Sequence, residues 1–258
     1  MRIFLILEET SFYQPSFIAA LLKNKAYQYV GAALVTKVPA KNSLDKYFQK
    51  YWYYLKPIEI SKLVIKKLEL DIKQKFFSAN DTFYSVSGVL KQFGVDYIHI
   101  EYDINKDEYL DFIASKKPDI IISSNPLIFK KKLLSIPKIC SINRHSSLLP
   151  SYAGLLPVFH AYRKGENFVG VTIHTMESKI DKGIILAQKS IQIEQNDTVD
   201  QLYQKCFDIS ADLCFEALEK IRNNQMEAVI ANDASPSYYA FPNKKDWAEF
   251  RQKGGRFI

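Results

Sequence analysis

The chain has 258 residues, of which 47% are hydrophobic, and this is enough to bury a core and excludes an intrinsically disordered protein. Its formal net charge is +7, but Lys supplies 29 of the 35 basic residues and these are scattered, whereas RNA-binding surfaces usually draw on Arg. We therefore expect no nucleic-acid partner, and we consider an anionic, nucleotide-linked substrate compatible with the charge.

The first hundred residues predict three strands and one helix. Apolar runs indicate strands at 3–7, 29–35 and 95–100. Pro15 stands where it can occupy the first turn of a helix over 17–22. Because Glu8 ends the first apolar run, that run is too short for a signal peptide. No later stretch approaches the roughly 18 apolar residues of a membrane span, so we expect a cytoplasmic chain with no membrane partner.

Residues 37–94 separate the second and third predicted strands and exceed what a minimal strand–helix unit needs. Their apolar periodicity predicts two or three inserted helices. The aromatic run Tyr51–Tyr54 suits stacking on a base or sugar, but aromatic residues at helical spacing more often pack in a core or an interface. We therefore interpret this run as packing.

The rest of the chain continues to alternate strands with helices. Asn105 and Glu108 predict a helix start, and a nearly all-apolar strand follows at 119–122. Thr198 is predicted to cap one long amphipathic helix that covers the sheet. Further predicted elements are a helix at 157–164, strands at 168–176 and 184–193, an extended arm at 237–242 and one or two helical turns at 246–250.

This alternation predicts an α/β fold, with a Rossmann-like, mostly parallel and twisted sheet flanked by helices. We expect a catalytic domain over 1–222, with a helical insertion at about 37–94, and a short C-terminal arm over 223–258. No Gly-x-Gly-x-x-Gly follows the first strand, so the fold implies no dinucleotide. The three cysteines form no Cys-x-x-Cys pair, which argues against a disulfide framework and a zinc site.

An amide, an imidazole and a carboxylate stand in an order that suits acyl transfer. Asn143 precedes His145 by two residues, and Asp181 follows 36 residues after the imidazole. An imidazolium can protonate a developing oxyanion, an amide can donate to the same oxygen, and a carboxylate can orient the imidazole or accept a proton. The other histidines, His99, His160 and His174, show no metal-ligand spacing, and we expect structural roles for them.

The flanking sequence resembles the formyltransferases that use 10-formyltetrahydrofolate. The hallmark of that family is Asn-x-His, then Ser-Leu-Leu-Pro and Gly, with an Asp-x-Gly further on. This chain reads Asn143-x-His145, Ser147-Leu148-Leu149-Pro150, Gly154, Gly170-Val171-Thr172-Ile173-His174 and Ile180-Asp181-Lys182-Gly183. The order and spacing of these motifs make the resemblance specific, and it spans roughly residues 95–222.

The resemblance implies a catalytic triad of Asn143, His145 and Asp181 that needs no metal. Asn143 and His145 would stabilise the oxyanion, and Asp181 would hold His145 and aid proton transfer. The formyl donor would be 10-formyltetrahydrofolate. The resemblance places its pterin on the loop after the fourth strand, and we take the following as candidate cofactor-binding residues: Asn125, Pro126, Leu127, Ile128 and Ile180.

Three branches of the resembled family differ in the amine that receives the formyl group. Methionyl-tRNA formyltransferases carry a further C-terminal barrel, whereas only some 35 residues follow the long predicted helix here. Glycinamide ribonucleotide enzymes have a glycine-rich phosphate loop near the start, where this chain has Glu8–Ser11. Sugar N-formyltransferases, which act on nucleotide-linked amino sugars for surface polysaccharides such as lipopolysaccharide, resemble the chain best in size and motif.

Alternatives outside this branch stay open. A methionyl-tRNA formyltransferase-like enzyme is one, and a formyltetrahydrofolate hydrolase, in which water replaces the amine, is another. A non-catalytic folate- or sugar-nucleotide-binding module would predict a damaged triad, and the triad is intact in sequence. The aromatic tail and the insertion offer apolar surface, so we also expect a homodimer.

Overall fold

The computed structural model describes residues 1–76, 83–227 and 235–258. Residues 77–82 of the predicted insertion and 228–234 of the predicted arm lie outside the described residues. The chain divides into two compact units. The first unit comprises 1–43, 67–143 and 175–179, and the second comprises 44–66, 144–174 and 180–258. The division into a domain over 1–222 and an arm over 223–258 stays a prediction.

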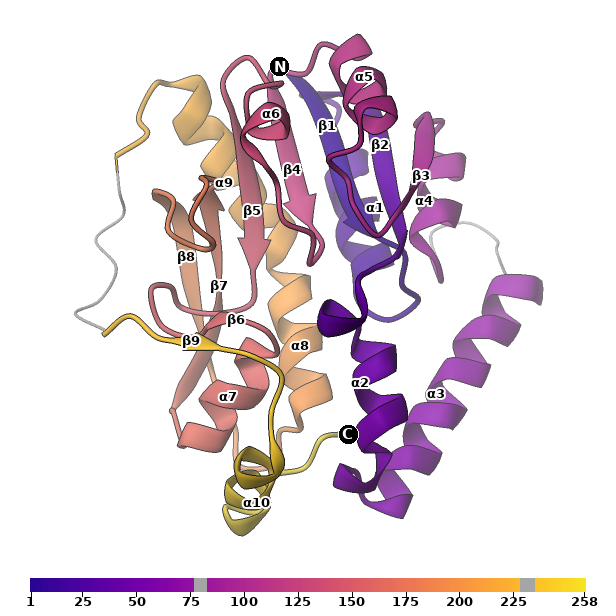
Figure 1. The fold of residues 1–258 in the computed structure, drawn as a ribbon, viewed down its shortest axis with the longest axis vertical. Coiled ribbons are helices and arrows are strands. Elements are labelled where there is room, and N and C mark those ends of the chain that lie inside the picture. Colours follow the sequence, from indigo (N-terminus) through magenta and orange to yellow (C-terminus); the bar gives the residue numbers. More distant parts are fainter. Residues whose placement is uncertain (77–82, 228–234) are drawn as a thin grey trace. The chain divides into compact units, whose positions relative to one another are not determined.

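One sheet of seven strands follows the order β3-β2-β1-β4-β5-β7-β8 (Figure 1). β1 pairs in parallel with β2 and with β4, and the pairs β2–β3 and β4–β5 are parallel too. β7 and β8 pair in the antiparallel sense. The predicted α/β, Rossmann-like fold with a mostly parallel sheet flanked by helices is therefore confirmed.

The first unit contains the parallel strands of the sheet. Its strands are β1 (Arg2–Glu8), β2 (Gln28–Lys37), β3 (Tyr97–Glu101), β4 (Ile120–Ser124) and the first residues of β5 (Cys140–His145). Its helices are α1 (Gln14–Lys23), η1 (Ala40–Asn42), α4 (Val86–Gln92), α5 (Asp107–Ser115) and α6 (Lys131–Leu134). β4 is buried along its whole length, as expected for a central parallel strand covered on both faces.

The second unit combines an antiparallel strand pair with most of the C-terminal helices. Its strands are β6 (Ala153–Gly154), β7 (Phe168–Thr175), β8 (Ile185–Gln192) and β9 (Tyr238–Tyr239). Its helices are α2 (Leu44–Tyr51), η2 (Trp52–Tyr54), α7 (Pro157–Lys164), α8 (Val199–Asp208), α9 (Ser210–Arg222) and α10 (Lys244–Gln252). α7 packs against α8 and α10, and α9 packs against β8. α3 (Pro57–Phe76) has residues in both units.

Part of the predicted insertion packs against the C-terminal residues. The Tyr47 hydroxyl on α2 accepts a 2.6 Å hydrogen bond from Trp247 Nε1 and donates one of 2.8 Å to the Pro242 carbonyl. Tyr54 stacks on Trp247 with ring centroids 5.8 Å apart. The interpretation of the aromatic run as packing therefore holds for Tyr54, whereas Trp52 is 62% exposed.

Two predicted helix boundaries are wrong. The long helix after Thr198 is two helices, because Ile209 interrupts it and the Ser210 hydroxyl donates to the carbonyl of Cys206 at 2.6 Å. α5 begins at Asp107, since the Asn105 side-chain oxygen that would cap an earlier start accepts from Lys130 N–H at 2.8 Å instead. Thr198 does cap α8, in a capping box with Gln201. Across the described ranges, no helix is both long enough and apolar enough to cross a membrane.

Candidate active site

Strand β5 carries two of the three candidate catalytic side chains. Asn143 and His145 are two residues apart on it, so their side chains leave the same face of the sheet. Both are half-buried, whereas Arg144 between them leaves the opposite face and is buried. The alternation of side chains along β5 therefore places the Asn143 amide and the His145 imidazole on the same face of the sheet.

Arg144 supports this strand from behind. Its Nε donates to the Ser210 hydroxyl at 2.9 Å, and its guanidinium lies 3.7 Å from the centroid of the Phe207 ring. Burial lowers the pKa of Arg144 to about 10, which leaves it charged at neutral pH. Its Nη2 is buried without a hydrogen-bond partner among the described residues. Ser210, the first residue after the interruption at Ile209, is thus also a partner of strand β5.

His145 contacts the segment that follows the Ser-Leu-Leu-Pro motif. Its Nε2 lies 3.2 Å from the carbonyl oxygen of Tyr152. Tyr152 has a left-handed backbone with φ of 59°, a conformation that costs on the order of 1 kcal/mol or more in a residue other than glycine and tends to occur at functional sites. The carbonyl therefore faces His145 from a constrained backbone.

Asp181 contacts the same segment two residues further on. Its Oδ2 accepts a 3.0 Å hydrogen bond from the backbone N–H of Gly154, and its Oδ1 lies 3.7 Å from Nε2 of His174. The Asp181 side chain is 9% exposed and that of His174 is 3% exposed. Asp181 also has a left-handed backbone, with φ of 52°. The contacts that the structure gives to this carboxylate are thus with Gly154 and His174.

His145 and Asp181 therefore both contact residues 152–154. The carbonyl of Tyr152 meets the imidazole and the amide of Gly154 meets the carboxylate. Two residues of chain span at most about 7 Å, so both groups are held around one short segment. Asn143, two residues before His145 on the same face, completes a set of two donors and a carboxylate.

The C-terminal residues hold this short segment in place. Tyr152 N–H donates to the Ser237 hydroxyl at 2.8 Å, and Leu155 N–H donates to the Tyr239 carbonyl at 2.8 Å. β6 pairs in parallel with β9, which aligns Gly154 with Tyr239. Gly154 has φ of +95°, and a Cβ built there would lie 2.2 Å from the Tyr239 carbonyl oxygen. Only glycine fits this close approach.

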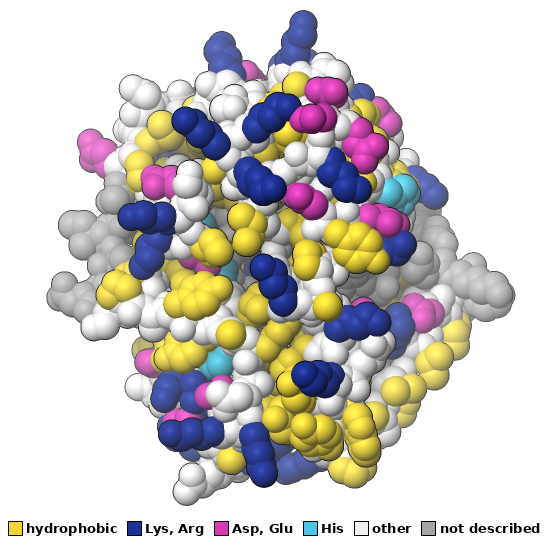
Figure 2. Space-filling model, in the orientation of Figure 1, with side chains coloured by type: hydrophobic (Ala, Val, Ile, Leu, Met, Phe, Trp, Pro, Cys, Tyr) yellow, Lys and Arg dark blue, Asp and Glu magenta, His cyan; other side chains and the backbone are white. Residues whose placement is uncertain are grey.

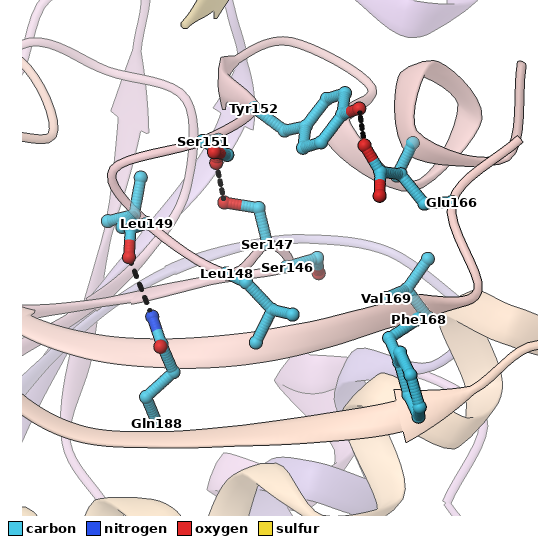
Figure 3. Close-up of a pocket in the computed structure, with 11 residues that line it drawn as sticks. Ser146, Ser147, Leu148, Leu149, Ser151, Tyr152, Glu166, Phe168, Val169 and Gln188 are labelled. Atoms are coloured by element: carbon cyan, nitrogen blue, oxygen red, sulfur yellow. Dashed lines mark hydrogen bonds between the residues drawn. The ribbon is translucent and has the colours of Figure 1, made fainter. Parts of the chain in front are cut away.

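A small pocket of about 220 Å³ lies beside the same loop (Figure 3). Tyr152 OH donates to Glu166 at 2.5 Å, and Gln188 donates to the Leu149 carbonyl at 2.9 Å. Burial and the neighbouring Glu166 raise the pKa of the Tyr152 hydroxyl, so it stays a neutral donor. Since these polar groups are bonded to one another, we interpret them as supports for the loop.

The loop after β4 contains four of the candidate cofactor-binding residues. The Asn125 amide donates to the Ile6 carbonyl at 3.0 Å, and its oxygen accepts from Leu127 N–H at 2.9 Å. Leu127 is 7% exposed and belongs to the core, whereas Ile128 is 49% exposed. Pro126 is half-buried, and its carbonyl accepts from Asn42 at 2.9 Å.

These contacts decide which groups of the loop fit a pterin. Leu127 N–H is already bonded to Asn125, so it is a poor candidate for reading the ring. The carbonyls of Pro126 and Ile128 each accept one bond, from Asn42 and Asn105, and each keeps a second lone pair. Ile128 offers exposed apolar cover on this loop, whereas Ile180 belongs to the second unit and is 49% exposed. A ring with N–H donors and an apolar face fits this donor set.

The partners of Asp181 and of Tyr152 were not predicted from the sequence. His174 was expected to be structural, yet its Nε2 lies 3.7 Å from Oδ1 of the Asp181 carboxylate. Ser237 carried no signal, because it stands 85 residues after Tyr152 in a tail that matches no motif. No group of three or more His, Cys, Asp or Glu residues in the described ranges could hold a metal ion.

The sequence matches a known protein family and its members. Residues 71–218, more than half of the chain, match the family model described as formyl transferase. The chain is 35% identical over 162 residues to methionyl-tRNA formyltransferase from Thermotoga maritima, covering 62% of this chain and 51% of that protein. The match thus spans about half the length of this relative.

Solved structures of low identity share the fold. An N-formyltransferase from Helicobacter canadensis, in complex with folinic acid and dTDP-3-aminofucose, has a TM-score of 0.56 at 20% identity, covering 95% of this chain and 72% of that one. A phosphoribosylglycinamide formyltransferase from Anaplasma phagocytophilum has a TM-score of 0.59 at 15% identity, covering 92% and 97% of the two chains.

Proposed function

The chain belongs to the formyl transferase family, and we propose that it moves a formyl group from 10-formyltetrahydrofolate to the primary amine of a nucleotide-linked amino sugar. The observation that supports the chemistry is that His145 contacts the Tyr152 carbonyl and Asp181 contacts the Gly154 N–H two residues later, while Asn143 stands two residues before His145 on β5. An acyl transfer needs donors for a developing oxyanion and a group that accepts the proton of the amine. These three side chains supply both.

Asn143 and His145 act on the formyl oxygen in this proposal. The donor supplies the formyl group, and the Asn143 amide and the His145 ring stabilise the negative charge that develops on its oxygen. Asp181, held by Gly154 N–H and by His174, receives the proton that the amine releases and returns it to the leaving nitrogen. Asn125, Pro126, Leu127 and Ile128, together with Ile180, bind the pterin in this proposal, mainly through carbonyl oxygens and the exposed isoleucines.

Charge and structural likeness support an amino-sugar nucleotide as the acceptor. The net charge of +7 favours an anionic acceptor of this kind. The Helicobacter canadensis protein was solved with folinic acid and a dTDP-linked amino sugar, and this chain resembles it in fold over 95% of its length. Methionyl-tRNA is the second candidate acceptor, because the identity of 35% is with an enzyme of that name.

The test is an assay for tetrahydrofolate released from 10-formyltetrahydrofolate. The acceptors are a panel of nucleotide-linked amino sugars, charged methionyl-tRNA and a control without acceptor. We expect turnover with an amino sugar alone. Turnover only with the tRNA would make methionyl-tRNA the acceptor in place of the amino sugar. Turnover in the control without acceptor would identify a hydrolase. Absence of turnover with every acceptor, in a folded protein, would contradict the proposed function.

A further inference from the structure

Helix α3 has an exposed apolar stripe along its outer face. Its outward side chains Ile58, Val64, Ile65, Leu68 and Ile72 are each more than half exposed. Figure 2 shows hydrophobic side chains gathered at the lower right, over the region of α2, η2 and α3. A surface helix of a monomer normally turns its apolar stripe inward and its charges outward. An outward stripe of this kind marks an interaction surface.

The inner face of α3 is anchored by charged residues instead. Glu59 is buried and pairs with Arg251, whose Nη1 lies 2.8 Å from Glu59 Oε1, and it also accepts from Phe257 N–H at 2.7 Å. Lys66, two helical turns later, donates to Asp200 at 2.6 Å. These contacts fix the rotation of the helix about its own axis. The apolar stripe is therefore held outward, because the opposite side is already committed to ion pairs.

The spacing of the stripe matches a coiled-coil seam. Ile58, Ile65 and Ile72 recur every seven residues, and Leu68 follows Ile65 by three. In this heptad Ile58, Ile65 and Ile72 occupy the first core position and Leu68 the fourth, whereas the fourth position of the preceding heptad is Ser61. A seam on one helix can be covered by the same seam on a second copy, in an isologous contact. The pattern therefore fits a second copy of this chain as the partner.

The charges beside the seam select the direction of pairing. Lys62 and Glu69 occupy the same flanking position in successive heptads, one of each sign. In an antiparallel pair this position faces its own counterpart, so Lys62 of each copy meets Glu69 of the other. In a parallel pair Glu69 would instead face Val64 and Lys62 would face Pro57, with no opposite charges brought together. Electrostatic complementarity thus favours the antiparallel arrangement.

We propose that α3 forms an antiparallel homodimer interface, in which Ile58, Ile65, Leu68 and Ile72 of two copies interdigitate and Lys62 pairs with Glu69 across the two-fold axis. η2, shortly before α3 in the chain, also exposes Trp52, which is 62% exposed, and Tyr53, which is 58% exposed. This interface is independent of the formyl-transfer chemistry.

Analytical ultracentrifugation of the full chain over a concentration series tests the interface. We expect wild type to sediment as a dimer, and Ile65→Asp to weaken dimerisation by at least about a hundredfold, because the two-fold axis places two carboxylates in the apolar seam. The matched control is Ile139→Asp, at another exposed isoleucine, which is 44% exposed and lies in the first unit. A wild-type monomer, or a dimer that Ile65→Asp leaves intact, would overturn the interface.

Charge reversal tests the antiparallel register without relying on a core substitution. Lys62→Glu and Glu69→Lys, each alone, should weaken dimerisation by about tenfold, since each creates two like-charge contacts. The double variant should restore most of the dimerisation, because it exchanges the partners, while the pair of Glu69 with Lys73 within the helix is lost. Circular dichroism melts of each variant check that the helix is retained. Failure of the double variant to restore dimerisation would overturn the antiparallel pairing.

Discussion

The loop after β4 and the segment 152–154 both carry candidate site residues, but they are held in different ways. The loop is fixed by side-chain amides, namely those of Asn125 within it and of Asn42 and Asn105 in the same unit. The segment 152–154 is fixed by Ser237 and Tyr239, which are more than eighty residues away in the chain. The motif therefore supplies the candidate reactive side chains, whereas residues of the C-terminal tail hold the segment that contacts them. This difference predicts that the C-terminal residues matter for turnover, although they carry no reactive group.

The largest expected effect comes from closing the space between the two short strands. Gly154→Ala would place a methyl group 2.2 Å from the Tyr239 carbonyl oxygen, which separates β6 from β9 and displaces the amide that holds Asp181. We expect turnover to fall on the order of 100-fold, comparable to the loss of one oxyanion donor. Steady-state kinetics of tetrahydrofolate release measures this.

A matched control separates crowding from backbone strain. Gly94 also has a positive φ, of +66°, but an added Cβ there has nothing within 4 Å. Gly94→Ala should cost on the order of 1 kcal/mol in stability and leave turnover near wild type. Equal losses of turnover in the two alanine variants would contradict the role given to the β6–β9 contact.

The next effect is on the stability of the tail against pH. Burial lowers the pKa of His160 to about 4, and its Nε2 lies 2.9 Å from the Ala240 carbonyl, which joins α7 to the tail. The unfolded chain binds this proton near pH 6.5 and the folded chain only near pH 4, so stability is complete above pH 6.5 and is lost as the pH falls towards 4. We expect a loss on the order of 2 kcal/mol over that window.

Urea unfolding at neutral pH and near pH 4 measures this slope. His160→Gln keeps a hydrogen-bond donor but does not titrate, so the part of the slope due to His160 should disappear. Carboxylates elsewhere titrate in both proteins and cancel in the difference. Identical slopes for wild type and His160→Gln would show that His160 is not held neutral in the folded protein.

A change in the other region should affect donor binding instead. Asn125→Ala removes hydrogen bonds to the Ile6 carbonyl, the Ser123 hydroxyl and Leu127 N–H. We expect the KM for 10-formyltetrahydrofolate to rise by about tenfold, corresponding to one or two lost hydrogen bonds, with the KM for the acceptor unchanged. A rise confined to the acceptor would remove this loop from the donor site.

The smallest expected effect is from a single remote hydroxyl. Ser237→Ala removes the acceptor of Tyr152 N–H and should lower kcat by about fivefold, since one such bond contributes on the order of 1 kcal/mol. Ser135→Ala, which removes a 2.9 Å bond to the Lys132 carbonyl on the surface, is the control. If both serine variants keep full turnover, the C-terminal support of Tyr152 is not needed for catalysis.

The sequence predicted what depends on local pattern. Apolar runs located β1, β4 and β7, and Thr198 correctly marked the start of α8, because strand burial and helix capping are short-range properties. The sequence also showed Asn143 two residues before His145, and on β5 this spacing puts both side chains on one face.

What the sequence did not reveal depends on contacts between distant residues. At the break after α8, the Ser210 hydroxyl donates to the Cys206 carbonyl and accepts from Arg144. The sequence of the helix itself does not indicate that Arg144 is a partner. The contact of Asp181 with His174, and the support of Tyr152 by Ser237, likewise join segments that no local periodicity links. The outward stripe of α3 was visible only as a periodic run, whose direction is set by the ion pairs of Glu59 and Lys66.

The most direct test of the central claim is transfer of a labelled formyl group from 10-formyltetrahydrofolate to an amino-sugar nucleotide by wild type and by His145→Ala. We expect labelled product with wild type and at least about a 100-fold slower reaction with the variant, because an oxyanion donor is lost. Donor binding, measured by calorimetry, should be retained in the variant. Equal rates of transfer in the two proteins would contradict the account.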